Sequence, residues 1–229
     1  IFGPKSRNLI TEIAGDLFQT KNFPFGTGKN IIIKGIKVWA QRLSYVGELG
    51  WEIYIPIKSA KKIYDEVIKV GTKYDLCHAG AHAMDILRME KGYLHWGHDI
   101  SPEENQYEAG LNFAISFKKN VDFIGRDVLV RKKNEKPKKK LIILTLKDSK
   151  PGYPLLQHDE PIYINNKIMG RTTSGNYSFN YKKNMAFGYI NNISKDECKN
   201  IEVEVEKIKY KAILETKPLH DSKNKNIKL

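Results

Sequence analysis

Residues 42–52, which read Arg-Leu-Ser-Tyr-Val-Gly-Glu-Leu-Gly-Trp-Glu, indicate the fold of this part of the chain. Its two glycines favour a turn, because glycine adopts the positive φ angles that tight turns require. Residues 37–45 read as a strand, and apolar and polar side chains alternate along residues 51–55. The pattern predicts a hairpin of two antiparallel strands with its turn at residues 46–50.

Helical periodicity flanks this hairpin on both sides. Apolar side chains recur every three to four residues along residues 4–14, 59–70 and 80–91. Residues 101–104, Ser-Pro-Glu-Glu, have the capping residue, first-turn proline and first-turn acids of a helix start. With a further strand at residues 31–33, the first part of the chain is predicted to mix helices and strands.

From residue 141 the pattern changes to short strands separated by turn-rich pieces. The six predicted strands cover residues 141–146, 161–164, 167–174, 185–190, 201–205 and 210–214. Strands of this number and length favour a small antiparallel barrel or sandwich. The lysine-rich residues 132–140 mark the boundary, which places one domain at 1–135 and a second at 136–229. The polar residues 221–229 are predicted to be loose.

The composition is that of a folded protein. Of 229 residues, 41% are hydrophobic and 28% are charged, so disorder is not expected over most of the chain. No apolar run reaches the roughly 20 residues of a membrane-spanning helix, so no membrane partner is expected. The chain opens Ile-Phe-Gly-Pro without a methionine, from which we expect a fragment that lacks its N-terminal part.

The cysteines and histidines indicate neither a disulfide framework nor a metal site. Cys77 and Cys198 lie far apart in sequence and fit no metal-ligand spacing, so we expect two buried free thiols in a reducing cytoplasm. Only His78 and His82 have the helical spacing of a metal pair, and the sequence pairs them with no obvious third ligand. No bound metal is expected.

A formal charge of +13 is compatible with nucleic acid, an anionic membrane or a small anionic ligand as a partner. Only six of the 39 basic residues are arginine, the residue whose planar fork suits phosphates and guanine edges. We interpret most of the charge as a solvated lysine surface and expect no nucleic acid. A basic nucleic-acid-binding protein stays an alternative.

Five motifs occur in order along the chain. The first two are Gly3-Pro4-Lys5-Ser6-Arg7 and residues 42–52. The others are residues 87–100, then Glu108-Ala109-Gly110-Leu111 with Phe123-Ile124-Gly125-Arg126, then Thr173-Ser174-Gly175 with residues 185–189. In this order they resemble the glycine-cleavage T-protein (aminomethyltransferase) family, whose signature is R-x-[ST]-Y-x-G-E-x-G-x-E. The resemblance covers nearly the whole chain.

Within the family, the sequence is more similar to the C-terminal folate-binding modules of sarcosine and dimethylglycine dehydrogenases. Residues 90–97, with Glu90-Lys91-Gly92-Tyr93 and His95-Trp96-Gly97, resemble their E-K-[GA]-[YF]-R-x-W stretch. T-proteins of glycine cleavage place a folate-holding arginine where this chain has Met84. The resemblance implies an α+β fold, in which a truncated ferredoxin-like α/β folate-binding domain precedes a small antiparallel Greek-key β-barrel.

The resemblance also implies that Glu52 binds the pterin ring of tetrahydrofolate and that Tyr45 lines the same cavity. The chemistry fits, because a carboxylate can accept paired, charge-assisted hydrogen bonds from the ring N–H and the exocyclic amine of a pterin. The strand pattern alone would make Glu52 an ordinary solvent-facing carboxylate.

Three more residues fall at positions that the family uses. Phe113 stands where T-proteins carry a tryptophan that packs on folate, and the alternative is a plain core phenylalanine. Lys140 opens the barrel strand where relatives place basic residues near the glutamate tail of folate, and the alternative is solvated charge. We interpret Arg88 as a structural ion-pair former near Asp85 and Glu90.

The function that the resemblance implies is transfer of a one-carbon unit from a small methylated amine to tetrahydrofolate. We expect no catalytic residue in this chain, because the aspartate to which the family assigns proton management would precede Ile1. His95 and Asp99 do not predict a hydrolase triad, since the pattern places no nucleophile beside them. The isolated chain would therefore be an incomplete enzyme.

Other partners and alternatives follow from the same features. The chain lacks the Gly-x-Gly-x-x-Gly pattern of a dinucleotide site, so FAD would bind only on a separate flavin dehydrogenase domain. A truncated first domain would expose a sheet edge, which allows a homo-oligomer. The alternative within the family is a non-catalytic folate-binding or scaffold protein.

Overall fold

The computed structural model describes residues 1–119, 121–191, 194 and 197–229. Contacts divide them into two compact units: Ile1–Lys91 together with His220–Leu229, and Gly92–Leu219. Residues 92–135, which the sequence assigned to the first domain, group here with the barrel strands. The domain boundary between residues 135 and 136 stays a prediction. Within the described ranges, no helix is long and apolar enough to cross a membrane.

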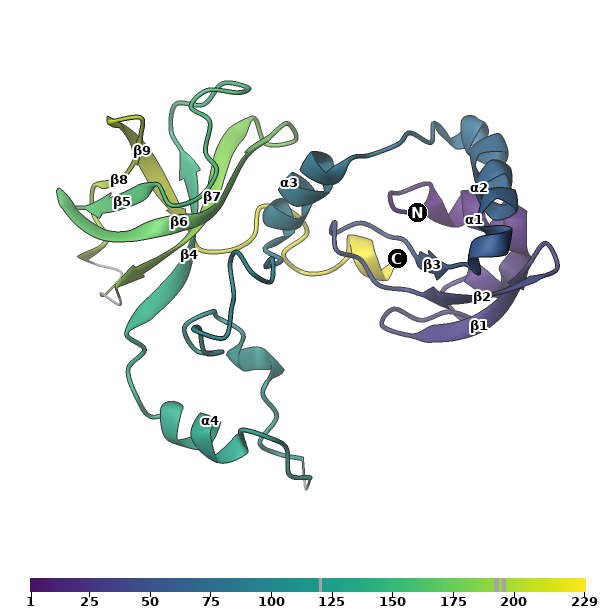
Figure 1. Ribbon diagram of the computed structural model, residues 1–229, viewed down its shortest axis with the longest axis horizontal. Coiled ribbons are helices and arrows are strands. Elements are labelled where there is room, and N and C mark those ends of the chain that lie inside the picture. Colours follow the sequence, from purple (N-terminus) through teal and green to yellow (C-terminus); the bar gives the residue numbers. More distant parts are fainter. Residues whose placement is uncertain (120, 192–193, 195–196) are drawn as a thin grey trace. The chain divides into compact units, whose positions relative to one another are not determined.

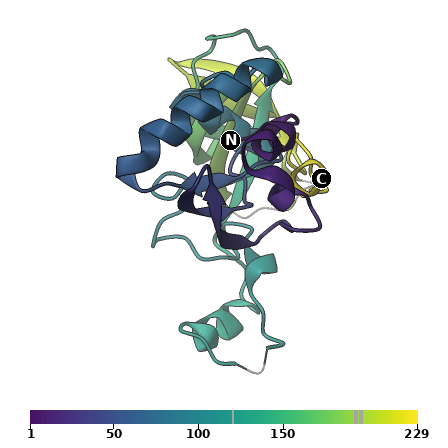
Figure 2. The same cartoon turned by 90° about the vertical axis from the view of Figure 1, so that its right-hand side faces the viewer.

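The first unit is a three-stranded antiparallel sheet with helices α1 and α2 on one face (Figure 1 and Figure 2). The strands lie in the order β1 (Gly28–Ile33), β2 (Ile36–Gln41) and β3 (Glu52–Tyr54). The helices are α1 (Ser6–Ala14), α2 (Ile57–Gly71) and α3 (Ala81–Lys91), with short 3-10 turns η1 (Gly15–Phe18), η2 (Thr72–Tyr74) and η5 (Asn226–Lys228). All three predicted helices and the predicted pairing of the hairpin strands are confirmed, with Gln41 opposite Glu52.

The core of this unit forms where the apolar faces of α1 and α2 meet the sheet. It includes Leu9 and Ile10 from α1, Ile63 from α2 and Val38 from β2, each with 2% or less of its surface exposed. Full burial of one such side chain stabilises a fold by roughly 1.5–3 kcal/mol. The hydrophobic periodicity that predicted these helices therefore also supplies the packing that holds them.

The chain between β2 and β3 is a longer loop than the predicted turn. The predicted strand 37–45 ends at Gln41, and the next residue, Arg42, is fully buried. Its Nη1 donates a hydrogen bond to the carbonyl oxygen of Phe23 at 2.7 Å. Residues 42–51, which we call the signature loop, connect the two strands.

The second unit is dominated by a closed six-stranded barrel of the order β4-β7-β6-β5-β8-β9. Its strands are β4 (Lys139–Leu146), β5 (Pro161–Ile164), β6 (Lys167–Ser178), β7 (Lys183–Asn191), β8 (Ile201–Val205) and β9 (Ile208–Glu215). Strands β5, β6 and β7 follow one another as neighbours, and β4, which precedes them by a long connection, lies beside β7. This is the Greek-key order, so the predicted barrel is confirmed.

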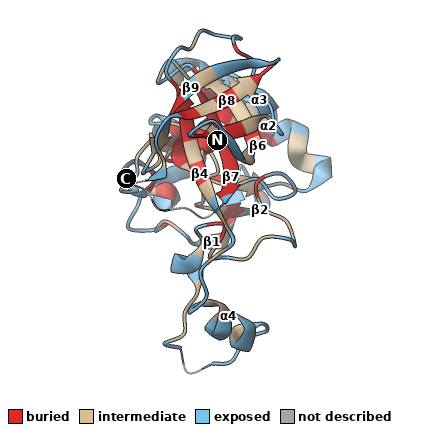
Figure 3. Cartoon of the chain, turned by 90° about the vertical axis from the view of Figure 1, so that its left-hand side faces the viewer, coloured by how far each residue is buried: buried red, intermediate tan, exposed pale blue. Residues whose placement is uncertain are grey.

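Outside the barrel strands, the helices that the structure describes in the second unit are η3 (Asn112–Ala114) and α4 (Arg126–Lys132). Buried residues run along the barrel strands, whereas α4 is drawn in exposed and intermediate colours (Figure 3). No residue of α4 is buried in the described structure. The barrel therefore has its own apolar core, and α4 adds nothing to it.

The prediction of a helix that starts at residues 101–104 is wrong. The Glu104 carboxylate accepts hydrogen bonds from the backbone N–H and the hydroxyl of Ser101 at 2.9 and 2.7 Å. Asn105 and Glu108 form a reciprocal pair one turn later, in which Asn105 N donates to Glu108 Oε2 and Glu108 N donates to Asn105 Oδ1. Both pairs cap a single turn, and the second begins before the first could extend into a helix.

Two further expectations are corrected by the structure. The tail that was predicted to be loose belongs to the first unit, where Ile227 is 2% exposed (yellow in Figure 1). A buried ion pair between Lys91 and Asp221 is one of the contacts that hold it. Both cysteines are free thiols, but neither is buried as predicted: Cys77 is exposed in the irregular chain before α3, and Cys198 is half-buried.

Candidate ligand site

A pocket of about 460 Å³ lies in the first unit beside β3, the edge strand of the sheet, and α2. Its lining is mostly apolar and comprises Ile1, Phe2, Trp51, Glu52, Ile53, Tyr54, Ile55, Ile63, Tyr64 and Val67. Apolar walls with a few polar groups are typical of small-molecule sites, in which the polar groups fix the orientation of the ligand. Glu52 is the carboxylate of this lining.

Glu52 is held by its neighbour on the same side of β3. Tyr54 Oη donates a hydrogen bond to Glu52 Oε2 at 2.9 Å. This hydrogen bond, above other causes, raises the pKa of Tyr54, so the phenol stays a donor at neutral pH. An ionised carboxylate has about four lone-pair sites. One hydrogen bond from Tyr54 therefore orients Glu52 and leaves it capacity to accept further donors.

Tyr45 lies in the signature loop and is partly exposed. The lining of the pocket includes Glu52 but not Tyr45. The structure thus gives the two predicted folate-contacting residues different surroundings, although both belong to the first unit. A role for Tyr45 in a ligand cavity stays a prediction.

The signature loop is fixed by the first of the five motifs. Leu49 O accepts hydrogen bonds from Gly3 N at 2.8 Å and from Ser6 Oγ at 2.9 Å. Within the loop, Glu48 N donates to Ser44 Oγ at 3.1 Å. Two motifs far apart in sequence therefore meet through one backbone hydrogen bond and one from the Ser6 hydroxyl.

Arg42 begins the signature loop as a buried cation. Its guanidinium lies 5.7 Å from the centre of the Trp51 ring and donates to the carbonyl oxygen of Leu229. Burial, followed by repulsion from Arg7, lowers the pKa of Arg42, which still leaves an arginine charged at neutral pH. The sequence motif could not show that this residue serves the loop rather than a ligand.

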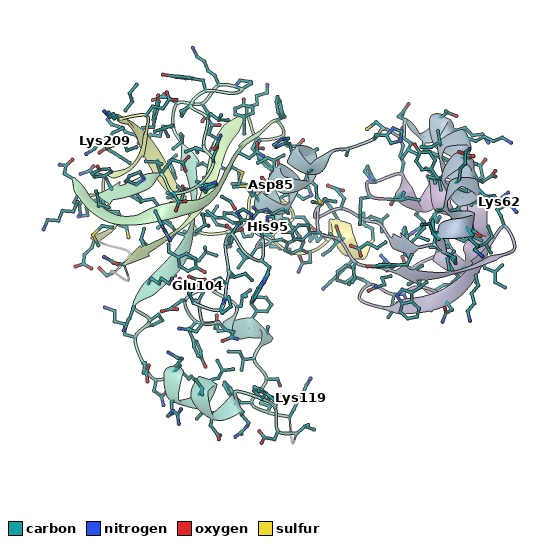
Figure 4. The ribbon with its side chains drawn as sticks, in the orientation of Figure 1. Lys62, Asp85, His95, Glu104, Lys119 and Lys209 are labelled. Carbon is teal, nitrogen blue, oxygen red and sulfur yellow. The ribbon has the colours of Figure 1, made fainter. Side chains whose placement is uncertain are left out.

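Phe113 and Lys140 lie in the second unit. Phe113 is 81% exposed on η3, so the alternative of a core phenylalanine is wrong. Lys140 is exposed on β4, beside Lys139, whose ammonium pairs with Glu104 (labelled in Figure 4). The ring and the ammonium are both accessible, and their roles toward folate stay predictions.

The sequence missed a polar network around Asp99, which is fully buried in the second unit. Asp99 Oδ1 accepts hydrogen bonds from Thr173 Oγ1 at 2.6 Å and Ser174 Oγ at 2.8 Å, and Oδ2 accepts one from His95 N at 2.9 Å. Tyr189 Oη donates to Asp99 O at 2.9 Å, and burial above all raises the pKa of Tyr189. Two more of the five motifs thus meet in a structural network.

Arg88 has the structural role that the sequence predicted. It is 1% exposed, and its Nη2 lies 2.8 Å from Asp85 Oδ1 on the same helix (Asp85 is labelled in Figure 4). Among the residues that the structure describes, no group of three or more His, Cys, Asp or Glu side chains could hold a metal ion.

Comparison with protein families places these motifs in a known context. Residues 1–119 match the GCVT N-terminal domain, and residues 139–221 match the glycine cleavage T-protein C-terminal barrel domain. The chain belongs to the glycine cleavage T-protein family. The closed barrel and the joined motifs described above are thus features of a family member.

Curated relatives of this family member are longer proteins. The chain is 34% identical to the mitochondrial sarcosine dehydrogenase of Mus musculus over 100% of its own length and 25% of that protein. It is 33% identical to the mitochondrial dimethylglycine dehydrogenase of Homo sapiens over 96% of its length and 25% of that protein. It therefore spans about a quarter of these relatives.

A solved structure has the same fold. The glycine cleavage system aminomethyltransferase T from Bartonella henselae superposes with a TM-score of 0.80, covering 96% of this chain and 58% of that one. At 20% sequence identity this similarity shows the fold alone.

Proposed function

We propose that this chain is the tetrahydrofolate-binding part of a one-carbon transfer enzyme of the T-protein or sarcosine and dimethylglycine dehydrogenase type. The observation that carries the proposal is the position of Glu52. It lines a largely apolar pocket at the end of the family signature and is oriented by Tyr54. A flat pterin ring with a two-donor edge suits a pocket of this kind.

In this proposal the contribution of the chain is binding and orientation. The Glu52 carboxylate accepts hydrogen bonds from the ring N–H and the exocyclic amine of the pterin, while the aliphatic and aromatic walls exclude water. Tetrahydrofolate, when bound, supplies the nitrogens that accept the one-carbon unit. A fixed pterin edge aims those nitrogens, and correct placement alone can lower a reaction barrier by several kcal/mol.

The other steps of the proposed reaction require a domain outside this chain. Oxidation of a small methylated amine with FAD is assigned to a flavin dehydrogenase domain like those of the longer relatives. No side chain of this family member is proposed as a general acid or base. The same proposal leaves Tyr45, Phe113 and Lys140 as candidate folate contacts.

The test is a calorimetric titration of tetrahydrofolate into the chain and into Glu52→Gln, which keeps the shape of the side chain but removes its charge. We expect the affinity of the variant to fall more than tenfold, or about 1.4 kcal/mol. The matched control is Asp65→Asn, a carboxylate on α2 that pairs with Lys61 and does not line the pocket. Its affinity should equal that of the parent.

Other outcomes separate the alternatives. A folded parent that does not bind tetrahydrofolate would contradict the proposal. Salt-sensitive binding to RNA or DNA that ignores Glu52→Gln would favour a nucleic-acid-binding protein. Binding that depends on Glu52, without one-carbon transfer when the amine-oxidising partner is supplied, would favour the non-catalytic scaffold.

A further inference from the structure

The C-terminal segment His220–Leu229 contacts the signature loop at its start and in its middle. At the start of the loop, Leu229 O accepts a hydrogen bond from Arg42. The same oxygen accepts a second one, at 2.5 Å, from Arg7 of α1. In the middle, His220 Nε2 lies 2.8 Å from Glu48 Oε1. The last residues of the chain therefore reach two points of the loop that leads into Glu52.

Lys91, the last residue of α3, links the same segment to the loop a third time. Its ammonium donates to Asp221 O at 2.5 Å and to Asp221 Oδ2 at 3.1 Å, and these side chains are 2% and 4% exposed. The hydrocarbon stem of Lys91 lies against Gly47, where an added Cβ would come within 3.0 Å of three Lys91 atoms. Gly47 also has a φ of +77°, so the loop is shaped to this contact.

Asp221 is fixed in turn by its own segment. Its carboxylate accepts hydrogen bonds from Lys225 N at 2.6 Å and from Asn226 N at 3.1 Å. Burial raises the pKa of Asp221, but the hydrogen bonds from Lys91 and these amides lower it by more, so the carboxylate is ionised. Lys91 therefore has a permanent counter-charge.

We infer that the C-terminal segment is a positioning element for the ligand site at Glu52. The signature loop ends at Trp51, directly before Glu52, so a shift of the loop would reach Glu52 at the first residue of β3, where it pairs with Gln41. The lining of the pocket includes neither His220, Asp221 nor Lys91, so these residues act through the loop. The choice of tetrahydrofolate as the ligand rests on the proposed function.

The first measurement is hydrogen exchange of the peptide that spans residues 42–51, in the parent, Asp221→Asn and His220→Ala. Arg42 N and Glu48 N donate to Thr27 O and Ser44 Oγ, so they report on loop order. In Asp221→Asn we expect the exchange of this peptide to rise at least tenfold more than that of β1, and in His220→Ala to rise more than that of β1 by a smaller factor. Ile13→Val, which trims a buried side chain of α1, is the control for general loss of stability. Unchanged loop exchange in Asp221→Asn would overturn the inference.

The second measurement is tetrahydrofolate affinity under conditions where every variant is fully folded. A positioning role predicts more than tenfold weaker binding by Asp221→Asn and weaker binding by His220→Ala, with Ile13→Val equal to the parent. A purely structural role would lower thermal stability and leave the affinity unchanged, which would overturn this inference and not the proposed function. A parent that binds no tetrahydrofolate would overturn the proposed function and the ligand-positioning role, while the exchange data still decide whether the segment holds the loop.

Discussion

Glu52 in the first unit and Asp99 in the second are both carboxylates of family motifs, but their surroundings differ. Asp99 is fully buried and accepts hydrogen bonds from two hydroxyls and a backbone amide. Glu52 is partly exposed, lines a pocket and accepts a hydrogen bond from Tyr54.

The difference separates motif residues that hold the fold from motif residues that can hold a ligand. A buried carboxylate is stable only when internal donors satisfy it, and those donors are then unavailable to a ligand. A carboxylate at an apolar pocket retains acceptor capacity that a ligand can use. The family motifs contain both kinds of carboxylate, and the degree of burial of each carboxylate distinguishes them.

The largest expected effect is that of Asp99→Ala. The substitution leaves the Thr173 and Ser174 hydroxyls and the His95 amide without their acceptor, so we expect the second unit to lose about 3 kcal/mol or more of unfolding free energy. Urea unfolding with hydrogen exchange of β6 measures the loss. Asp148→Ala, an exposed carboxylate of the same unit, should change stability by less than about 0.5 kcal/mol.

This pair of variants tests whether Asp99 and Glu52 have different roles. If Asp99→Ala were as stable as Asp148→Ala, the buried network would not be structural. If Glu52→Gln destabilised its unit as much as Asp99→Ala does, then Glu52 would belong with the residues that hold the fold.

An effect of at most similar size is expected from acid, and it tests how the signature loop is held. The folded pKa of Asp221 lies below its ordinary value, so the unfolded chain takes up the proton first and stability falls as pH drops through the lowered pKa. At neutral pH, Asp221→Asn should cost about 3 kcal/mol, because Lys91 is left buried without its counter-charge. This difference should shrink below about pH 4, the ordinary range of an aspartate.

Thermal unfolding of the parent and of Asp221→Asn at pH 7, 5 and 3 measures this effect. The comparison of the two proteins cancels the titration of the other carboxylates. A gap that stays constant from pH 7 to pH 3 would show that the Asp221 charge does not stabilise the first unit.

Much of the fold could be predicted from the sequence because its elements have local patterns. The strand β8 was predicted at residues 201–205, which are its observed bounds, because Val and Ile alternate with Glu along it. The helix expected at residues 101–104 failed for the opposite reason. The capping residues of a helix start are present. However, Glu104 closes one single turn with Ser101, and Asn105 caps a second, separate turn.

The parts that could not be predicted depend on residues distant in sequence. Lys91 and Asp221 are 130 residues apart, and neither has a pattern that names the other. A tail of lysines and asparagines has the composition of a loose terminus, whereas the buried ion pair, the hydrogen bonds to Leu229 O and the buried Ile227 show that it is bound. For the candidate site, the motif indicated Glu52, but the pocket and the Tyr54 hydrogen bond come from the fold.

The smallest expected effect concerns Phe113, which extends the comparison to an apolar side chain. Because the ring is 81% exposed, Phe113→Ala should change the unfolding free energy by less than about 0.5 kcal/mol. If the ring stacks on folate as the family position implies, the affinity for tetrahydrofolate should fall several-fold, since an aromatic contact is worth roughly 0.5–1.5 kcal/mol. Calorimetric titration of Phe113→Ala beside Val121→Ala, another exposed apolar residue of the second unit, distinguishes a specific contact from general surface change. Equal affinities in both variants and the parent would contradict a role for Phe113 in folate binding.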